Sequence, residues 1–353
     1  MLVAPGDLDE AALAEAVERG WGISVASMGY LAIGWGSHHW KVAGADGAAW
    51  FVTVDELENK RVSASESLDD GFVRLRAALG SAVALRNAGR DFVVAPVPAR
   101  GPAAGRGAGD LAGDVAGDLA GQLLDDDDGP AVRFGGRFAV AVYPFTEGHS
   151  YGWGEWTAER RSAALEMVAA VHTAPAWVRG HALADNFAVP FREQAEAVCS
   201  GADVPECGPY THRVTRLLRE HATGIRRLLD RYDRRTAAAR ALPGKNVLTH
   251  GEPHPGNVML TGDGWRLIDW DTAAVAPPER DLWDLGPDDT VLDAYAAMTG
   301  VRPLPELLEL YRFGWDIKDI ACVVARFSRP HGGDADDAES WRLLTSLVER
   351  AAG

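Results

Sequence analysis

The chain has 353 residues, enough for one large domain or two modest domains, each with its own hydrophobic core. Hydrophobic residues make up 47% and charged residues 24%, which is typical of a soluble globular protein. The net charge of −16 argues against nucleic acid or an anionic membrane as a partner, and it favours a cationic small molecule. Acidity that serves only solubility would give the same charge, so charge alone does not choose a function.

No apolar run reaches the roughly 18–20 residues of a membrane-spanning helix, and no basic, apolar leader opens the chain. The three cysteines, Cys199, Cys207 and Cys322, are an odd and sparse set. Such a set is typical of a reducing compartment and gives no disulfide framework. We therefore expect a cytoplasmic protein that does not associate with membranes.

The first hundred residues predict one helix, then a β-rich segment, then a second helix. Apolar residues at helical spacing indicate helices over 8–19 and 69–88. Between them, strand-like runs lie on both sides of the turn Gly34-Trp-Gly-Ser37 and again over 49–54. Glycine has no Cβ, so such a turn lets backbone amides approach phosphates closely. An ordinary hairpin turn has the same pattern.

Residues 101–131 interrupt this pattern. They contain Gly-Asp repeated at four-residue spacing and then four aspartates at 125–128. Repeated Gly-Asp occurs in calcium-binding β-rolls, but the nonapeptide consensus of those proteins is absent. The composition indicates a flexible, acidic surface insertion. We place it between two strands, expected over 92–97 and 131–142.

The remainder of the chain is predicted to be mostly helical. Residues 140–148 run from a strand into a turn that contains proline and glycine. Helical periodicity then appears over 155–171, over 190–242 and through much of the last 60 residues. The predicted organisation is a β-rich region over 1–142 and a larger helical region over 143–353.

The stretch 248–271 has the clearest pattern for chemistry. His250, Glu252 and Asn257 have the His-x-acid-x4-Asn spacing of a kinase catalytic loop, and Asp269 follows twelve residues after Asn257. A carboxylate in such a loop accepts the proton of a substrate hydroxyl, while an amide oxygen and a second carboxylate bind Mg²⁺. A short intervening hairpin returns Asp269 to the loop. A hairpin with a polar turn is the alternative, but several polar positions in register disfavour it.

This stretch resembles the aminoglycoside phosphotransferase family, relatives of protein kinases that phosphorylate small molecules. Their version usually reads His-Gly-Asp-x-His-x-Gly-Asn and then Ile-Asp-Trp-Asp or Ile-Asp-Trp-Glu. Here the chain reads His250-Gly-Glu-Pro-His-Pro-Gly-Asn257 and Ile268-Asp-Trp-Asp271. Within this family, the chain resembles phosphotransferases of the spectinomycin or aminocyclitol type. The resemblance implies an α+β, two-lobed protein-kinase-like fold, with a β-rich N-terminal lobe and a mostly helical C-terminal lobe.

The resemblance also implies roles for particular residues. Glu252 and His250 are the expected catalytic residues, and Asn257 and Asp269 are the expected ligands of Mg²⁺. ATP or GTP is the implied donor. The expected nucleotide contacts are Gly34, Gly36 and Ser37 of the glycine turn, the lysines Lys41 and Lys60, and Tyr143 and Phe145 of the interlobe hinge. Asp281 resembles an aspartate that braces the catalytic loop in the family.

Two positions depart from the family pattern. Kinases carry a lysine on the third strand that holds the phosphates, but Thr53 stands where we expect it. Lys41, on the second strand, and Lys60, just past the third, are the nearby replacements, and the sequence does not choose between them. Glu252 stands where the family usually has aspartate, so the base is one methylene longer.

The acceptor is expected to be a small, cationic, hydroxylated molecule such as an aminoglycoside or aminocyclitol antibiotic, which implies antibiotic resistance. Asp271, at an accessory acidic position beside the expected metal site, is expected to contribute to the acceptor site. Trp315, Asp316 and Asp319 lie near one another on a predicted helix and are expected to surround an amine. An exposed acidic helix face is the alternative. The sequence does not decide between a monomer and a dimer.

Two other functions remain open. A kinase for choline, homoserine or a sugar would use the same catalytic loop. A kinase-like binding protein without activity would carry departures such as Thr53 and Glu252.

Overall fold

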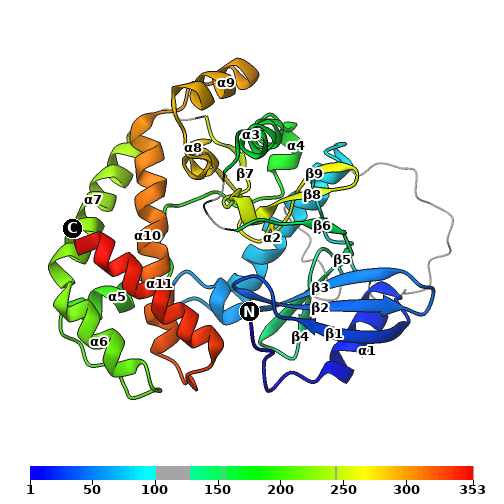
Figure 1. Cartoon of the computed structure of the whole chain (residues 1–353), viewed down its shortest axis with the longest axis horizontal. Helices are drawn as coiled ribbons and strands as arrows, with labels where there is room; N and C mark the ends of the chain where they lie inside the picture. Colours follow the sequence, from blue (N-terminus) through cyan, green and yellow to red (C-terminus); the bar gives the residue numbers. More distant parts are fainter. Residues whose placement is uncertain (101–127, 153, 155, 243–244, 353) are drawn as a thin grey trace.

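Five antiparallel strands form the sheet of the N-terminal lobe, in the order β1-β2-β3-β5-β4 (Figure 1). The computed structural model describes residues 1–100, 128–152, 154, 156–242 and 245–352. The strands are β1 (Val25–Leu31), β2 (Ser37–Gly44), β3 (Ala49–Glu56), β4 (Val132–Phe134) and β5 (Phe138–Pro144). The single strand predicted over 131–142 is wrong, because Gly135 and Gly136, with φ of 58° and 78°, turn the chain between β4 and β5.

One face of this sheet packs against α1 (Glu10–Trp21). Trp40 and Val42 of β2 and Val52 of β3 are fully buried there, together with Leu13 of the helix. Successive strand residues point to opposite faces, so the alternate positions face the rest of the molecule. On that side the core is shared with α2 (Leu68–Asn87), which begins at a capping box formed by Ser67 and Asp70.

The segment after α2 differs from the prediction. The strand expected over 92–97 is absent, and Val93 and Val97 form only isolated β-bridges. The expected acidic insertion lies outside the described residues from 101 to 127. Its flanks meet, because the backbone N–H of Ala99 donates to the carbonyl of Gly129 at 2.7 Å.

The C-terminal lobe is mostly helical, with two small sheets ordered β6-β8-β9 and β10-β7. Its strands are β6 (Gly148–His149), β7 (Val247–Thr249), β8 (Val258–Thr261), β9 (Gly264–Leu267) and β10 (Ala274–Ala276). Its α-helices are α3 (Ala158–His172), α4 (Ala176–Arg179), α5 (Arg192–Cys199), α6 (Thr211–Glu220), α7 (Ala222–Ala241), α8 (Glu279–Leu282), α9 (Asp289–Thr299), α10 (Pro305–Phe327) and α11 (Ala335–Ala352). Short 3₁₀ helices are η1 (Leu57–Lys60), η2 (Pro255–Asn257) and η3 (Trp283–Leu285).

The long helix α10 links the parts of this lobe (Figure 1). On one side it shares a hydrophobic core with α5, α6, α7 and α11, to which it contributes Leu310, Phe313 and Val324. Its other side turns toward the catalytic loop and the N-terminal lobe. The predicted α+β organisation, with a β-rich N-terminal lobe and a helical C-terminal lobe, is therefore confirmed. Within the part of the chain that the structure describes, no helix combines the length and apolar character needed to cross a membrane.

Candidate active site

A cleft of about 1230 Å³ lies between the two lobes. Several residues predicted for the catalytic loop, the phosphate site and the acceptor site open into it: Gly36, Lys60, Glu252, Asp269, Asp271, Trp315 and Asp319. They come from β-rich and helical segments more than 250 residues apart in the chain. The fold therefore gathers them around one space.

The catalytic loop follows β7 and is held from below by Asp281 of α8. The Asp281 carboxylate is fully buried and accepts the backbone N–H groups of His250 at 2.8 Å and of Gly251 at 2.6 Å. Burial alone would raise the pKa of Asp281, but a hydrogen bond from His172 at 3.0 Å and the nearby basic side chains together outweigh it, and the pKa is lowered. The bracing role predicted for Asp281 is confirmed by these bonds.

His250 is fully buried and does not line the cleft. Its Nδ1 accepts the backbone N–H of Glu252 at 3.2 Å, so the ring proton lies on Nε2, which donates to the carbonyl of Ile268 at 2.9 Å. Burial lowers the pKa of His250, which favours this neutral form. The ring joins the catalytic loop to the segment that follows β9 and has no nitrogen left for a substrate.

Glu252 occupies the floor of the cleft, and both ends of its peptide unit are fixed. Its N–H donates to His250, and its carbonyl accepts the side-chain amide of Asn257 at 2.9 Å. Its carboxylate oxygen Oε1 lies 2.7 Å from Nζ of Lys318 on α10. Burial would raise the pKa of Glu252, but the Lys318 ammonium holds it below its ordinary value. Glu252 is therefore an ionised carboxylate facing the cleft.

Asp269 and Asp271 stand side by side at the end of the hairpin and have opposite electrostatic surroundings. Asp269 has a left-handed φ of 67°, which redirects the chain directly after β9. Lys60 forms buried ion pairs with Asp271 and with Asp55 of β3, the latter at 2.8 Å. Burial opposes the charge of Asp271, but the ammonium of Lys60 outweighs it and lowers the pKa of Asp271. The pKa of Asp269 is instead raised well above its ordinary value, first by burial and then by the negative charges of Asp271 and Glu252.

The excess of negative charge around Asp269 would be balanced by a divalent cation bound beside it. The amide nitrogen of Asn257 is used by Glu252, which leaves its amide oxygen as the atom for a metal. One amide oxygen and one carboxylate match the oxygen ligands that Mg²⁺ takes, with water and phosphate oxygens completing the shell. A cation here would offset the repulsion that raises the pKa of Asp269.

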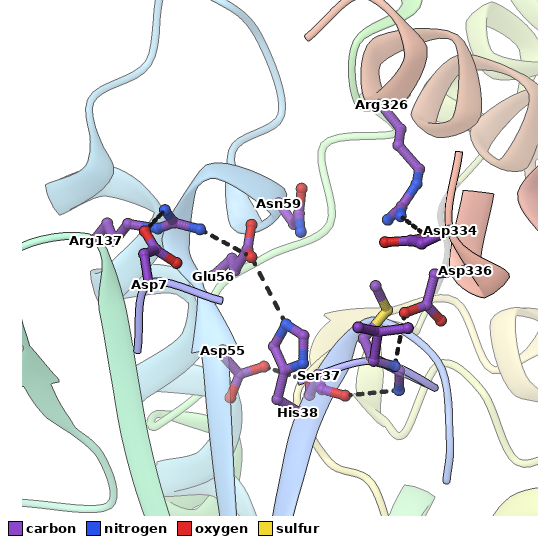
Figure 2. Close-up of polar contacts among 12 residues, drawn as sticks. Asp7, Ser37, His38, Asp55, Glu56, Asn59, Arg137, Arg326, Asp334 and Asp336 are labelled. Atoms are coloured by element: carbon purple, nitrogen blue, oxygen red, sulfur yellow. Dashed lines mark hydrogen bonds and ion pairs between the residues drawn. The ribbon is translucent and has the colours of Figure 1, made fainter. Parts of the chain in front are cut away.

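The glycine turn reaches the same lysine through Asp55. Gly34 and Gly36 have φ of 70° and 88°, which only glycine adopts readily, and they lead into Ser37. Ser37 Oγ donates to Asp55 at 2.6 Å (Figure 2). Asp55 in turn pairs with Lys60. A chain of polar contacts therefore joins the turn to the phosphate side of the cleft.

The rim of the cleft is also held across the lobes. Asp336 of α11 accepts the backbone N–H groups of Leu2 at 2.8 Å and Val3 at 3.0 Å (Figure 2). Tyr30 of β1 donates to the carbonyl of Met1 at 2.8 Å. The segment before α1 thereby ties the edge of the sheet to the last helix.

One face of α10 lines the cleft. Trp315, Lys318 and Asp319 lie three and four residues apart and share that face. The rings of Trp315 and Trp283 lie 5.6 Å apart. Nζ of Lys318 lies 4.9 Å from the centre of the Trp315 ring. Burial raises the pKa of Asp319 to about 7. Aromatic rings and a carboxylate together form a surface suited to a polar, amine-bearing ligand.

The family model described as "Phosphotransferase enzyme family" matches residues 34–317. The chain belongs to this family. The resemblance drawn from residues 250–271 is thereby confirmed, and the chain is a phosphotransferase by family. Protein StrN of Streptomyces griseus is 28% identical over 289 residues, which cover 76% of this chain and 75% of that protein.

Solved structures of kinases have the same fold as this phosphotransferase. Spectinomycin phosphotransferase APH(9)-Ia, in complex with ADP and spectinomycin, matches with a TM-score of 0.65 at 17% identity over 97% of each chain. A microcompartment-associated aminopropanol kinase matches with a TM-score of 0.55 at 15% identity over 97% of this chain and 96% of that chain. At these identities the likeness concerns the fold, and it confirms the expected two-lobed, kinase-like architecture.

Several predicted residues of the phosphotransferase lie outside the cleft. Lys41 is exposed on β2, where its ammonium lies 4.1 Å from the ring of Phe145. Tyr143 is buried at the end of β5, with the ring of Phe51 at 6.4 Å. Asp316 pairs with Arg350 of α11 at 3.1 Å, because it lies about 100° around the helix from Trp315. Of the two candidate lysines, Lys60 is the one beside the carboxylates.

Residues that the sequence reasoning did not single out complete the site. Lys318 contacts the expected base, Asp55 pairs with Lys60, and Trp283 pairs with Trp315. Lys318 had one available signal, since it stands three residues after Trp315 and adjoins Asp319 in a predicted helix. Trp283 had none, because Trp315 is 32 residues away in the chain. Asp55 is only five residues from Lys60, but no recognised motif links a carboxylate at the end of a strand to a lysine at that spacing.

Proposed function

We propose that this phosphotransferase transfers the γ-phosphoryl group of a nucleoside triphosphate to a hydroxyl of a small, amine-bearing molecule of the aminoglycoside or aminocyclitol type. One observation carries the proposal. Glu252, Asp269 and Lys60 line a single cleft that Trp315 and Asp319 of α10 also line. Phosphoryl transfer depends mainly on positioning and on charge stabilisation, and this arrangement can supply both.

Each residue has a proposed role. Glu252 accepts a hydrogen bond from the acceptor hydroxyl and takes its proton as the bond to phosphorus forms. Lys60, held by Asp55 and Asp271, offers its ammonium to the phosphate oxygens in place of the third-strand lysine. His250 and Asp281 position the loop and do not contact the acceptor.

Asn257 and Asp269 would hold Mg²⁺, which neutralises charge on the phosphate oxygens when bound. The glycine turn would approach the phosphates through backbone N–H groups, since Gly34 and Gly36 have no side chains to block them. The hinge after β5 would contact the nucleotide base near Phe145. We leave ATP and GTP as equal candidates for the donor.

Trp283, Trp315 and Asp319 are the proposed acceptor surface. Aromatic faces attract ammonium groups by about 0.5–2 kcal/mol, and a neighbouring carboxylate adds charge attraction. Asp271 is assigned to Lys60 rather than to the acceptor, because it is already paired. Asp316 is left out of the acceptor surface, because its carboxylate pairs with Arg350.

The test is a panel of acceptors with ATP and GTP, scored by phosphorus NMR of the product. Spectinomycin and kanamycin represent amine-bearing antibiotics, aminopropanol and choline represent small metabolites, and glycerol is the neutral control. We expect transfer to an amine-bearing acceptor and none to glycerol. Transfer to glycerol alone would contradict the cationic acceptor. Nucleotide binding without transfer to any acceptor would favour the binding-protein alternative.

A further inference from the structure

The base of this phosphotransferase is one methylene longer than the aspartate usual at its position. Its backbone is held in place by two hydrogen bonds. The Glu252 N–H donates to His250, and its carbonyl accepts from Asn257, so the backbone is fixed on both sides of Cα. The extra length, about 1.5 Å for one carbon–carbon bond, must therefore be taken up by the side chain.

The side chain uses this length to reach α10. Oε1 of Glu252 lies 2.7 Å from Nζ of Lys318, and the side chains are only 19% and 35% exposed. Lys318 is held in turn by the face of Trp315 at 4.9 Å. Although burial opposes its charge, the pKa of Lys318 is raised by Glu252, so the pair is ionic.

We propose that Lys318 is a positioning residue for the base: it holds one carboxylate oxygen of Glu252 so that the other faces the acceptor hydroxyl. This rests on the proposed phosphoryl transfer. Glutamate has one more rotatable bond than aspartate, and an unrestrained glutamate would spend much of its time in rotamers that miss the hydroxyl. Lys318 removes that freedom through a directional, charge-assisted bond.

The position of Lys318 also explains why a glutamate suits this chain. An aspartate at position 252 would stop about 1.5 Å short of Nζ and leave the ammonium of Lys318 without its partner. Glu252 and Lys318 therefore function as a unit, because the side chain of Glu252 is long enough to reach the ammonium of Lys318 on α10. Removing either should have much the same effect as removing both.

The test is a double-mutant cycle of kcat with an acceptor that the wild type phosphorylates. Lys318→Met should lower kcat about 10- to 100-fold, since small misplacements of a reacting group cost that much, while the nucleotide KM stays unchanged. Lys318→Arg should recover most of the rate, because it retains a cationic donor. In the Glu252→Asp background, Lys318→Met should change kcat by less than about 3-fold, because the pair is already broken.

Arg312→Met is the matched control, because Arg312 is an exposed cation on the same helix and does not line the cleft. It should leave kcat unchanged. A purely structural ion pair predicts a lower melting temperature with undiminished kcat in Lys318→Met, and that result would overturn the proposal. A loss that is equally large in both backgrounds would overturn it too. Absence of turnover by the wild type on every acceptor would instead overturn the proposed function, and this assignment with it.

Discussion

The predicted catalytic loop and the predicted phosphate-binding region both line the cleft, but they are assembled by different contacts. Glu252, Asn257 and Asp269 lie within one continuous stretch and are held mainly by hydrogen bonds among neighbouring residues. Lys60 depends on Asp271, which is 211 residues away in the chain. Local spacing therefore encodes the first region, whereas the second exists only when the lobes meet.

The same contrast appears in the two departures from the family pattern. Near the proposed phosphate site, β3 has no lysine where the family usually carries one, and Lys60 at the end of η1 reaches Asp55 and Asp271. At the catalytic loop, the longer base is matched by Lys318 from α10. In both places a change in one residue is accompanied by a lysine supplied from another element.

The largest effect is expected at Asp269. Asp269→Asn should lower turnover by at least about 10³-fold, because it removes the charged ligand proposed for Mg²⁺. It should not lower the melting temperature, since the present carboxylate is repelled by Asp271 and Glu252. Steady-state kinetics measures the loss of turnover, and thermal unfolding measures the melting temperature. Unchanged Mg²⁺ dependence of nucleotide binding in this variant would contradict the metal assignment.

Glu252→Gln tests the predicted catalytic loop, which is formed by residues close together in the sequence. It keeps the length and shape of the side chain but removes its basicity, so kcat should fall about 10²–10⁴-fold. The dissociation constant of the nucleotide should be unchanged, because Glu252 faces the acceptor side. Stopped-flow binding and steady-state rates separate these quantities. A Gln variant with full activity would exclude Glu252 from the chemistry.

Lys60→Met tests the proposed phosphate site, which depends on a contact between distant parts of the chain. Lys41→Met is its matched control. The Lys60 variant should lose about 10²–10³-fold in kcat/KM for the nucleotide, because a preorganised cation is lost from the phosphate site. It should also melt at a lower temperature, since Asp55 and Asp271 lose their buried partner. Lys41→Met should resemble the wild type. The reverse ranking of the two lysines would place the phosphates on β2.

The smallest expected effect concerns pH and the stability of the N-terminal lobe. Burial lowers the pKa of His39 on β2 from 6.5 to about 4. The unfolded chain therefore binds a proton before the folded protein does, and stability should fall as pH drops from about 6.5 toward 4. His39→Phe should flatten this part of the curve of melting temperature against pH.

The sequence by itself determined the kinase-like fold and the catalytic loop. The spacing from His250 to Asp269 is a local property, because a short loop and a tight hairpin bring these residues together, and Asp281 then braces the loop. Helical and strand periodicity likewise predicted the β-rich and helical lobes, since amphipathic patterns reflect which face of each element is buried. The errors, at 92–97 and 131–142, occurred where short strands depend on turns and partners.

The tertiary structure decided the parts of the site that come from separate elements. Only the meeting of η1 with the segment after β9 distinguishes Lys60 from Lys41, and only the packing of α10 turns Lys318 toward Glu252 and Asp316 toward α11. These contacts join residues 34 to 211 positions apart in the chain. Their geometry depends on how whole helices and lobes pack, which no local pattern of residues contains.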